Sequence, residues 1–281
     1  MFLRQIINKS KPLTLNLRAF SNLSPMVDLT TDDDGISIIT MQKPPVNKLN
    51  LEMLKEISLA LDDVERNKSK GLILTSSCPA VFSAGLDITE FFKPDIKRAE
   101  EFWRTLQDVY YKLFGARTVT AAAINGHAPA GGCLLSISTE YRVMVEGKYT
   151  IGLNETALGF VAPRWFMDAY CHTIPIRQAE YALTTSRMFT VEEALKVGLI
   201  DEKASDKADA INKCKSFIKK FDEIPSITRS MTKRRVREAI LSKFQERKEQ
   251  DVQEFLELLK HPEIRKQAEV HVRGINKMST K

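Results

Sequence analysis

The feature that most constrains the fold is a regular alternation of short β-rich stretches with longer helical stretches. The predicted strands cover residues 35–41, 71–76, 119–124 and 141–146, and the predicted helices cover residues 51–65, 97–114 and 134–140. Pro44 and Pro45 predict a turn after the first strand, because proline restricts its own φ angle and the conformation of the residue before it. Strands that alternate with helices in this way predict an α/β fold built on a parallel sheet.

A helical region follows the α/β part of the chain. Helical patterns succeed one another beyond about residue 175, at 177–185, 191–198, 207–221 and 229–260, and the last ends near His261 and Pro262. We therefore predict an α/β core over residues 28–220 and a helical C-terminal region over residues 221–281. This region either packs on the core or reaches a neighbouring subunit.

The N-terminal segment has the composition of a mitochondrial transit peptide. It contains several serines, and no acidic residue occurs before Asp28. Its basic residues are Arg4, Lys9, Lys11 and Arg18. Since basic, serine-rich and acid-poor leaders direct proteins to mitochondria, we predict a leader over residues 1–27, cleaved between Ala19 and Ser24, and a mature protein in the mitochondrial matrix. A disordered tail is the alternative, and the C-terminal MSTK differs from the peroxisomal signal SKL.

Composition argues against several classes of protein. The 281 residues are 43% hydrophobic and 28% charged, as in ordinary folded domains, and no apolar run approaches the ~20 residues of a membrane-spanning helix. The formal net charge is +6, but the basic residues do not form a stripe with interleaved aromatics, so we expect no nucleic-acid partner. The cysteines, read as reduced thiols, and the histidines are too scattered for a zinc site or a Ser/His/Asp triad. They are Cys78, Cys133, Cys171 and Cys214, and His127, His172, His261 and His271.

Three segments lie at predicted strand-to-helix junctions, where α/β proteins usually build ligand sites. The first, PAVFSAGLDITEF, covers residues 79–91. Gly85 lets the backbone approach a ligand closely, and the next residue, Leu86, can present an unpaired N–H group. A plain tight turn capped by Asp87 explains the same pattern.

The other two segments each offer one further chemical group. In AAINGHAPAGGCLL (122–135) a helix begins after small residues and glycines, and its N-terminus has free N–H groups for an anion. Close helix packing that requires glycine is the alternative. In YTIGLNETALGF (149–160), Glu155 lies among small and apolar residues, and burial would raise its pKa and make it a usable base. An exposed carboxylate at a helix cap is the alternative there.

Taken together, these segments resemble the crotonase, or enoyl-CoA hydratase/isomerase, superfamily over about residues 28–260. The order, spacing and local sequence of KPPVNKLN, ILTS, VFSAGLDITE, AINGHAPAGGC and IGLNETALGF agree with it, and the similarity is greatest to its isomerases. The resemblance implies a crotonase (ClpP-like) α/β fold of repeated ββα units with a helical C-terminal region, assembled as a homotrimer. It also implies an enzyme of fatty-acid β-oxidation that converts 3-cis- or 3-trans-enoyl-CoA to 2-trans-enoyl-CoA without a metal, nucleotide or flavin cofactor.

The same resemblance implies roles for individual residues. The N–H groups of Leu86 and Gly131 match the oxyanion-hole donors that hold the thioester carbonyl, and Glu155 matches the catalytic acid/base. The substrate and coenzyme A contacts that it implies are Ala84, Gly85, Leu86, Asp87, Ile88, Gly131 and Asn154. Candidates for an apolar wall around the acyl chain, with core packing as an equal alternative, are Phe160, Val161, Trp165 and Phe166.

One position separates two activities of the superfamily. Hydratases resemble the pattern GGGCE, whose glutamate positions the attacking water, whereas this chain has Leu134 at that place. A single carboxylate suits a proton shuttle better than water addition, so we predict an isomerase. The alternatives are a 2-enoyl-CoA hydratase, another reaction of the crotonase type, and a non-catalytic acyl-CoA-binding or RNA-binding homologue.

Overall fold

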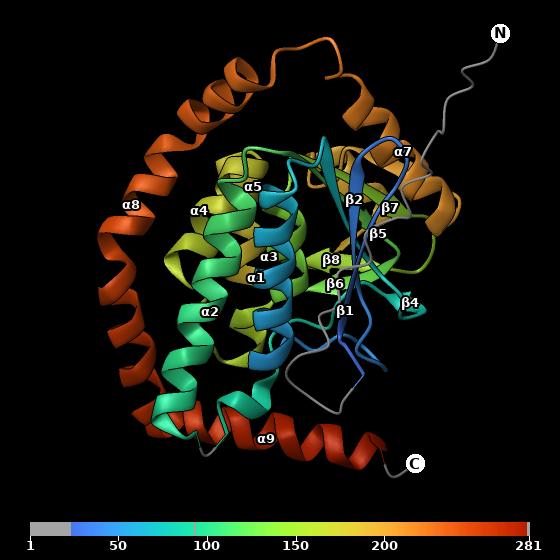
Figure 1. The fold of residues 1–281 in the computed structure, drawn as a ribbon. Coiled ribbons are helices and arrows are strands. Elements are labelled where there is room, and N and C mark those ends of the chain that lie inside the picture. Colours follow the sequence, from blue (N-terminus) through green and yellow to red (C-terminus); the bar gives the residue numbers. More distant parts are fainter. Residues whose placement is uncertain (1–23, 93, 280–281) are drawn as a thin grey trace, which may run out of the picture.

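The computed structural model describes residues 24–92 and 94–279 and contains two β-sheets surrounded by helices (Figure 1). Of the leader predicted over residues 1–27, only residues 24–27 lie within the described part. The first strand begins at Val27, which is fully buried. Within the described residues, no helix is both long enough and apolar enough to cross a membrane.

The larger sheet has six strands in the order β1-β2-β3-β5-β7-β10. They are β1 (Val27–Thr31), β2 (Ile36–Met41), β3 (Gly71–Ser76), β5 (Val119–Ile124), β7 (Tyr141–Val145) and β10 (Glu202–Ala204). Only β1 and β2 pair antiparallel, and every other neighbouring pair is parallel. The predicted parallel sheet is therefore confirmed, with two edge strands, the antiparallel β1 and the parallel β10, that the sequence pattern did not reveal.

The smaller sheet has four very short strands in the order β4-β6-β8-β9. They are β4 (Ala80–Val81), β6 (Gly126–Pro129), β8 (Thr150–Gly152) and β9 (Phe189–Thr190). The first three pair in parallel, and β9 closes the edge antiparallel. None of the four was predicted from the sequence, because runs of two to four residues are too short to show a period of two.

The two sheets together form repeated ββα units. Each unit has one strand in the larger sheet, one in the smaller sheet and then a helix: β3-β4-α2, β5-β6-α3 and β7-β8-α4. The helices are α2 (Ile96–Phe114), α3 (Gly131–Ile137) and α4 (Arg164–Thr173). The predicted helix over 134–140 was therefore placed three residues too late, since the helix already begins at the glycine pair.

Helices cover both faces of the larger sheet (Figure 1). Leu72 and Leu74 of β3 point into the main core, which α1 (Leu51–Arg66) and α2 share, whereas Ile73 points into a smaller core beneath α7 (Lys207–Lys219). Successive side chains of a strand face opposite sides of the sheet. Burial of both faces explains why the predicted strands read as continuous apolar runs.

The C-terminal helices surround the α/β layers. In chain order after α4 they are α5 (Ile176–Thr185), α6 (Val191–Val197), α7, α8 (Ser226–Lys260) and α9 (Pro262–Ser279). Figure 1 shows α8 running along the outside of the molecule beside α2, with α9 crossing below. The sequence pattern predicted that the last helix ends near His261. The helix does break there, but Pro262 starts a further helix, α9, because proline is well tolerated at the first position of a helix.

Candidate active site

The smaller sheet brings the three candidate segments together. Its strands β4, β6 and β8 are parallel neighbours, and each lies within one of the segments. Leu86 lies after β4, Gly131 after β6 and Glu155 after β8. Since the carboxyl ends of parallel neighbours lie at one edge of a sheet, residues distant in sequence meet there.

Two backbone N–H groups at this edge are unpaired within the described residues. Leu86 pairs with Leu49 through a single parallel bridge, in which the Leu49 N–H donates to the Gly85 oxygen (2.9 Å) and the Asp87 N–H donates to the Leu49 oxygen (3.0 Å). This pairing leaves the N–H of Leu86 itself facing away from Leu49. Gly131 is the first residue of α3, so its N–H has no acceptor inside the helix.

The residues before these two N–H groups have left-handed backbone conformations that bring the groups close together. Gly85 has φ +87°, and Ala130 has φ 47°, which is strained for a residue with a side chain. A Cβ atom built on Gly131 would lie 3.2 Å from the Leu86 nitrogen, and one built on Gly85 would lie 3.3 Å from the Gly131 nitrogen. The two donors can therefore bind one oxygen atom between them.

Glu155 brings a buried carboxylate to the same edge. It begins the short 3-10 helix η2 (Glu155–Leu158), anchored by the Phe160 N–H, which donates to the Glu155 backbone oxygen at 3.0 Å. Both side-chain oxygens are inaccessible to solvent and accept no hydrogen bond from the described residues, so the side chain does not cap a helix. Burial raises the pKa of this carboxyl to about 7, because desolvation disfavours the charged form.

The neighbours of Glu155 add no second acid. The Asn154 side-chain oxygen is also buried without a partner. The pKa values of the Cys133 thiol and the Tyr170 hydroxyl are raised, mainly because both groups are buried. The nearby charge of Glu155 raises both pKa values further. Across residues 24–92 and 94–279, no group of three or more His, Cys, Asp and Glu side chains is arranged to hold a metal ion.

A mainly apolar cavity of about 140 Å³ opens beside Glu155. Of the residues proposed from the sequence as contacts or wall, it is lined by Ala84, Leu86, Ile88, Asn154, Glu155, Phe160, Val161 and Phe166. Trp165 was proposed as wall but lies behind it, packed against Phe166 with ring centroids 4.5 Å apart. Gly85 and Gly131 shape the backbone beside the cavity and do not line it.

Asp87 has a local structural role as the N-cap of the 3-10 helix η1 (Ile88–Glu90). Its carboxylate accepts hydrogen bonds from the Thr89 N–H (3.2 Å) and the Thr89 hydroxyl (2.8 Å), and it lies 3.9 Å from the Lys43 ammonium. The capped turn anticipated as the alternative is thus present. It fixes the loop that carries Leu86.

Much of the cavity wall comes from residues that the sequence analysis did not single out. They are Phe91, Trp103, Pro129, Ala130, Leu158, Pro163, Phe255, Leu258 and Leu259. Trp103 belongs to α2, between the first two junction segments, and Phe255 belongs to α8, far along the chain from all three. Apolar residues on an amphipathic helix carry no sequence signal that separates a ligand wall from an ordinary core.

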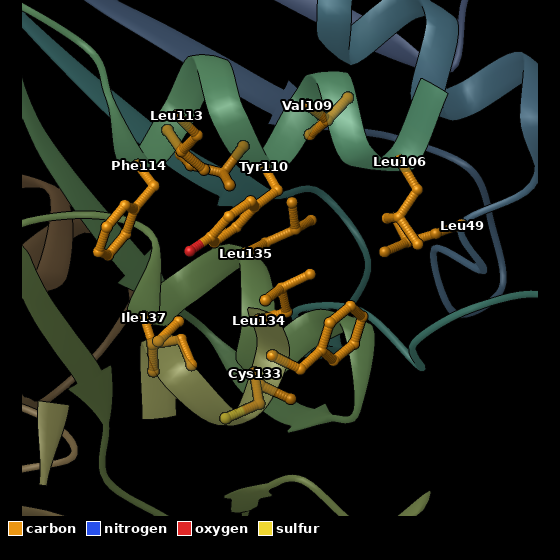
Figure 2. Close-up of a cluster of buried hydrophobic side chains, with 14 of the residues drawn as sticks. Leu49, Leu106, Val109, Tyr110, Leu113, Phe114, Cys133, Leu134, Leu135 and Ile137 are labelled. Atoms are coloured by element: carbon orange, nitrogen blue, oxygen red, sulfur yellow. The ribbon is translucent and has the colours of Figure 1, made fainter. Parts of the chain in front are cut away.

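Leu134 belongs to the hydrophobic core. It is 1% exposed, does not line the cavity and lies among buried side chains of α2 and α3 (Figure 2). Figure 2 shows its neighbours Leu49, Leu106 and Leu135 around it. Glu155 is therefore the one carboxylate among the described residues that line the cavity.

The repeated ββα units, with the three junction segments gathered at one edge of the smaller sheet, define a crotonase fold. The chain belongs to the enoyl-CoA hydratase/isomerase family, whose profile matches residues 31–274. It is similar to enoyl-CoA delta isomerase 1, mitochondrial, of Mus musculus, with 40% identity over 91% of this chain and 88% of the mouse protein. The protein of the same name from Homo sapiens is 37% identical over 85% of this chain and 79% of its own length.

A solved structure supports the same placement. The crystal structure of human mitochondrial delta3-delta2-enoyl-CoA isomerase matches with a TM-score of 0.87 and 35% identity, over 90% of this chain and 99% of the human chain. The fold class and the family predicted from the sequence are thereby confirmed.

Proposed function

We propose that this chain moves the double bond of a 3-enoyl-CoA to the 2-position, with Glu155 as the only proton carrier. The mouse and human relatives and the human solved structure are named as enoyl-CoA isomerases, which supports the reaction class. The observation that carries the mechanism is a buried, unpartnered carboxylate beside two unpaired N–H groups. Oxidation of unsaturated fatty acids is the metabolism in which we place the reaction.

The first step is removal of a proton from C2 of the substrate. The Glu155 carboxylate takes this proton, and the C–H electron pair enters a dienolate whose negative charge collects on the thioester oxygen. The Leu86 and Gly131 N–H groups donate hydrogen bonds to that oxygen. Donors fixed where charge develops lower the barrier, because they need no reorganisation during the reaction.

The second step returns the proton at C4. Glu155 is now a neutral acid, and protonation of C4 by it restores the carboxylate and leaves the conjugated 2-trans-enoyl thioester. A pKa near 7 suits a group that must first accept and then donate a proton near neutral pH. Every step uses residues of this chain, so we propose that no cofactor takes part.

The single acid in the cavity favours isomerisation over hydration. Addition of water requires a group that orients the water in addition to the group that transfers the proton. The position at which hydratases have a second glutamate holds the core residue Leu134. We therefore expect little hydratase activity from this chain.

The remaining assignments concern binding, location and assembly. We propose that Ala84, Asp87 and Ile88 face the adenosine side of coenzyme A, with the loop held by the capped turn at Asp87. The names of the relatives support a mitochondrial location, and the basic, acid-free leader supports import into the matrix. A homotrimer, a core over residues 28–220 and a C-terminal region over residues 221–281 remain proposals.

The decisive experiment measures isomerisation and hydration side by side. Purified protein is mixed with a medium-chain 3-enoyl-CoA while the ultraviolet absorbance of the conjugated thioester is followed, and a parallel assay supplies 2-enoyl-CoA. We expect fast isomerisation, little hydration, and loss of isomerisation in Glu155→Gln but not in Glu180→Gln, since Glu180 is exposed on α5. Acyl-CoA binding without isomerisation would overturn the proposal in favour of a binding protein, and strong hydration would overturn the role given to Leu134.

A further inference from the structure

One carboxylate outside the cavity connects three helices around its wall. A single oxygen of Asp251, Oδ2, accepts hydrogen bonds from Trp103 Nε1 (2.7 Å), Gln107 Nε2 (2.7 Å) and Trp165 Nε1 (3.1 Å). Asp251 belongs to α8, Trp103 and Gln107 to α2, and Trp165 to α4. No other carboxylate oxygen in the described part of the chain accepts from two indole groups.

The three N–H groups are the charge-assisted partners of Asp251. Among the described residues this partly exposed carboxylate forms no ion pair with a lysine, arginine or histidine, so its protein contacts are these hydrogen bonds. Hydrogen bonds to an ionised acceptor are stronger than neutral ones and fix geometry more tightly. The Trp103 ring is therefore held in place from behind.

The ring that Asp251 holds is part of the cavity wall. Trp103 lines the cavity and stacks on Phe255, with ring centroids 3.9 Å apart and planes 5° apart. Phe255 contacts Phe91 edge to face at 5.7 Å, and Phe91 lies 6.0 Å from Phe160. All four rings line the cavity.

We propose that Asp251 is a positioning residue that sets the chain-length preference of the enzyme by fixing the Trp103 ring at the aromatic end of the acyl cavity. The thioester end of the substrate lies at Leu86 and Gly131, on loops of the smaller sheet, whereas the aromatic rings come mostly from α2, α8 and the segment after η1. The acyl chain extends from the loops towards the rings. This inference rests on the proposed function, since it identifies the cavity as the acyl site.

A wall of stacked rings held by a carboxylate differs from a wall of flexible aliphatic side chains. It cannot yield to an extra methylene without breaking charge-assisted hydrogen bonds, so it discriminates by length. One methylene more or less in an apolar pocket changes kcat/KM by roughly tenfold or more. Loosening the ring should reduce that discrimination and leave the proton transfer at Glu155 intact.

The chain supplies its own spectroscopic probe for this site. It contains two tryptophans, and both donate to Asp251. Tryptophan emission, excited where adenine does not absorb, therefore reports on this cluster alone. Saturated acyl-CoAs from butanoyl-CoA to dodecanoyl-CoA serve as ligands, because they bind without turnover.

The test compares Asp251→Asn with a matched variant of the same helix pair. Asp168 on α4 also links to α8, with its carboxylate 3.2 Å from the Lys243 ammonium, but it touches no ring of the cavity wall. In the wild type we expect the emission change on binding to increase with chain length until the acyl chain reaches Trp103. In Asp251→Asn we expect the tryptophan emission of the free protein to shift. We also expect the ratio of kcat/KM between long and short 3-enoyl-CoAs to change by about tenfold, because KM changes more than kcat. Asp168→Asn should leave both unchanged.

The outcomes separate this inference from the proposed function. Emission that ignores acyl chain length, or an Asp168→Asn variant that changes the ratio as much as Asp251→Asn, overturns the inference. If Asp251→Asn does not fold, Trp103→Phe keeps a ring and removes one N–H donor, and a ratio within about twofold of the wild type in that variant overturns the inference as well. A wild type that shows length-dependent emission but no isomerisation overturns the proposed function and leaves the wall assignment standing.

Discussion

Replacing Glu155 by glutamine removes the one carboxylate among the described residues that line the cavity and keeps the shape of the side chain. General acid–base catalysis by one positioned group contributes roughly a hundredfold to ten-thousandfold in rate, so we expect kcat to fall by at least about a hundredfold. In the proposed mechanism the carboxylate form removes the C2 proton. Since burial raises its pKa to about 7, wild-type kcat/KM should rise with pH and level off above about pH 7.

The same burial predicts that the active form destabilises the folded chain. The folded-state pKa of Glu155 lies above its ordinary value of 4.5, so between these values the folded chain binds more protons than the unfolded chain, and stability falls as pH rises. A pKa raised from 4.5 to about 7 corresponds to roughly 3 kcal/mol of unfolding free energy. This penalty is absent below about pH 4.5 and complete above about pH 7.

Glutamine does not titrate, so the Glu155→Gln variant escapes this penalty. Its free energy of unfolding relative to the wild type should increase by up to about 3 kcal/mol as pH rises through the window from 4.5 to about 7. Burying an unpaired amide adds an offset that does not depend on pH. The variant should therefore combine lost activity with a stability, relative to the wild type, that grows above about pH 4.5 and reaches its full value above about pH 7.

Urea unfolding of both proteins across this pH range measures the difference directly. Glu180→Gln is the matched control, since it makes the same chemical change on the exposed surface of α5 and should give a nearly constant difference. If the difference in free energy of unfolding between Glu155→Gln and the wild type did not change with pH, the folded chain would have to solvate this carboxylate. That result would refute the claim that burial raises its pKa. Full activity of the variant would refute the assignment of Glu155 as the base.

Three further predictions test the oxyanion site, the core and the assembly. Gly85→Ala places a side chain at φ +87° with its Cβ 3.1 Å from that of Ala130. It should lower the free energy of unfolding by about 1–3 kcal/mol and kcat by about a hundredfold. The control Gly198→Ala lies at φ +82° with open space around it and should keep its kcat. Equal kinetic effects of the two would contradict the site. Leu134→Ala should cost about 2–5 kcal/mol in urea unfolding with little change in KM, and a large change in KM would place this side chain in the cavity. Light scattering should give three times the chain mass, because a trimer would cover exposed apolar side chains such as Ile176, which is 73% exposed in the single chain. A monomer would refute the trimer.

The chain's local patterns predicted most of the fold. The alternation of β-rich and helical stretches up to residue 146 predicted the larger sheet, because each of those elements is long enough to show its own period. The strands of the smaller sheet and both edge strands of the larger sheet, β1 and β10, were missed, since each has only two to five residues and shows too little of a strand period. Helix boundaries were wrong where local signals conflict, as at Pro262, which starts a helix as readily as it ends one.

The candidate site was likewise predicted from the sequence only in part. Sequence alone determined the three junction segments and the family, because glycines, small residues and a lone Glu155 at fixed spacing leave a local chemical pattern. Only the tertiary structure decided that both oxygens of Glu155 are buried without partners, that the cavity wall includes Trp103 and Phe255, and that Trp103 donates a hydrogen bond to Asp251. Burial, desolvation and contacts between distant helices are properties of packing, and no residue carries them before the chain has folded.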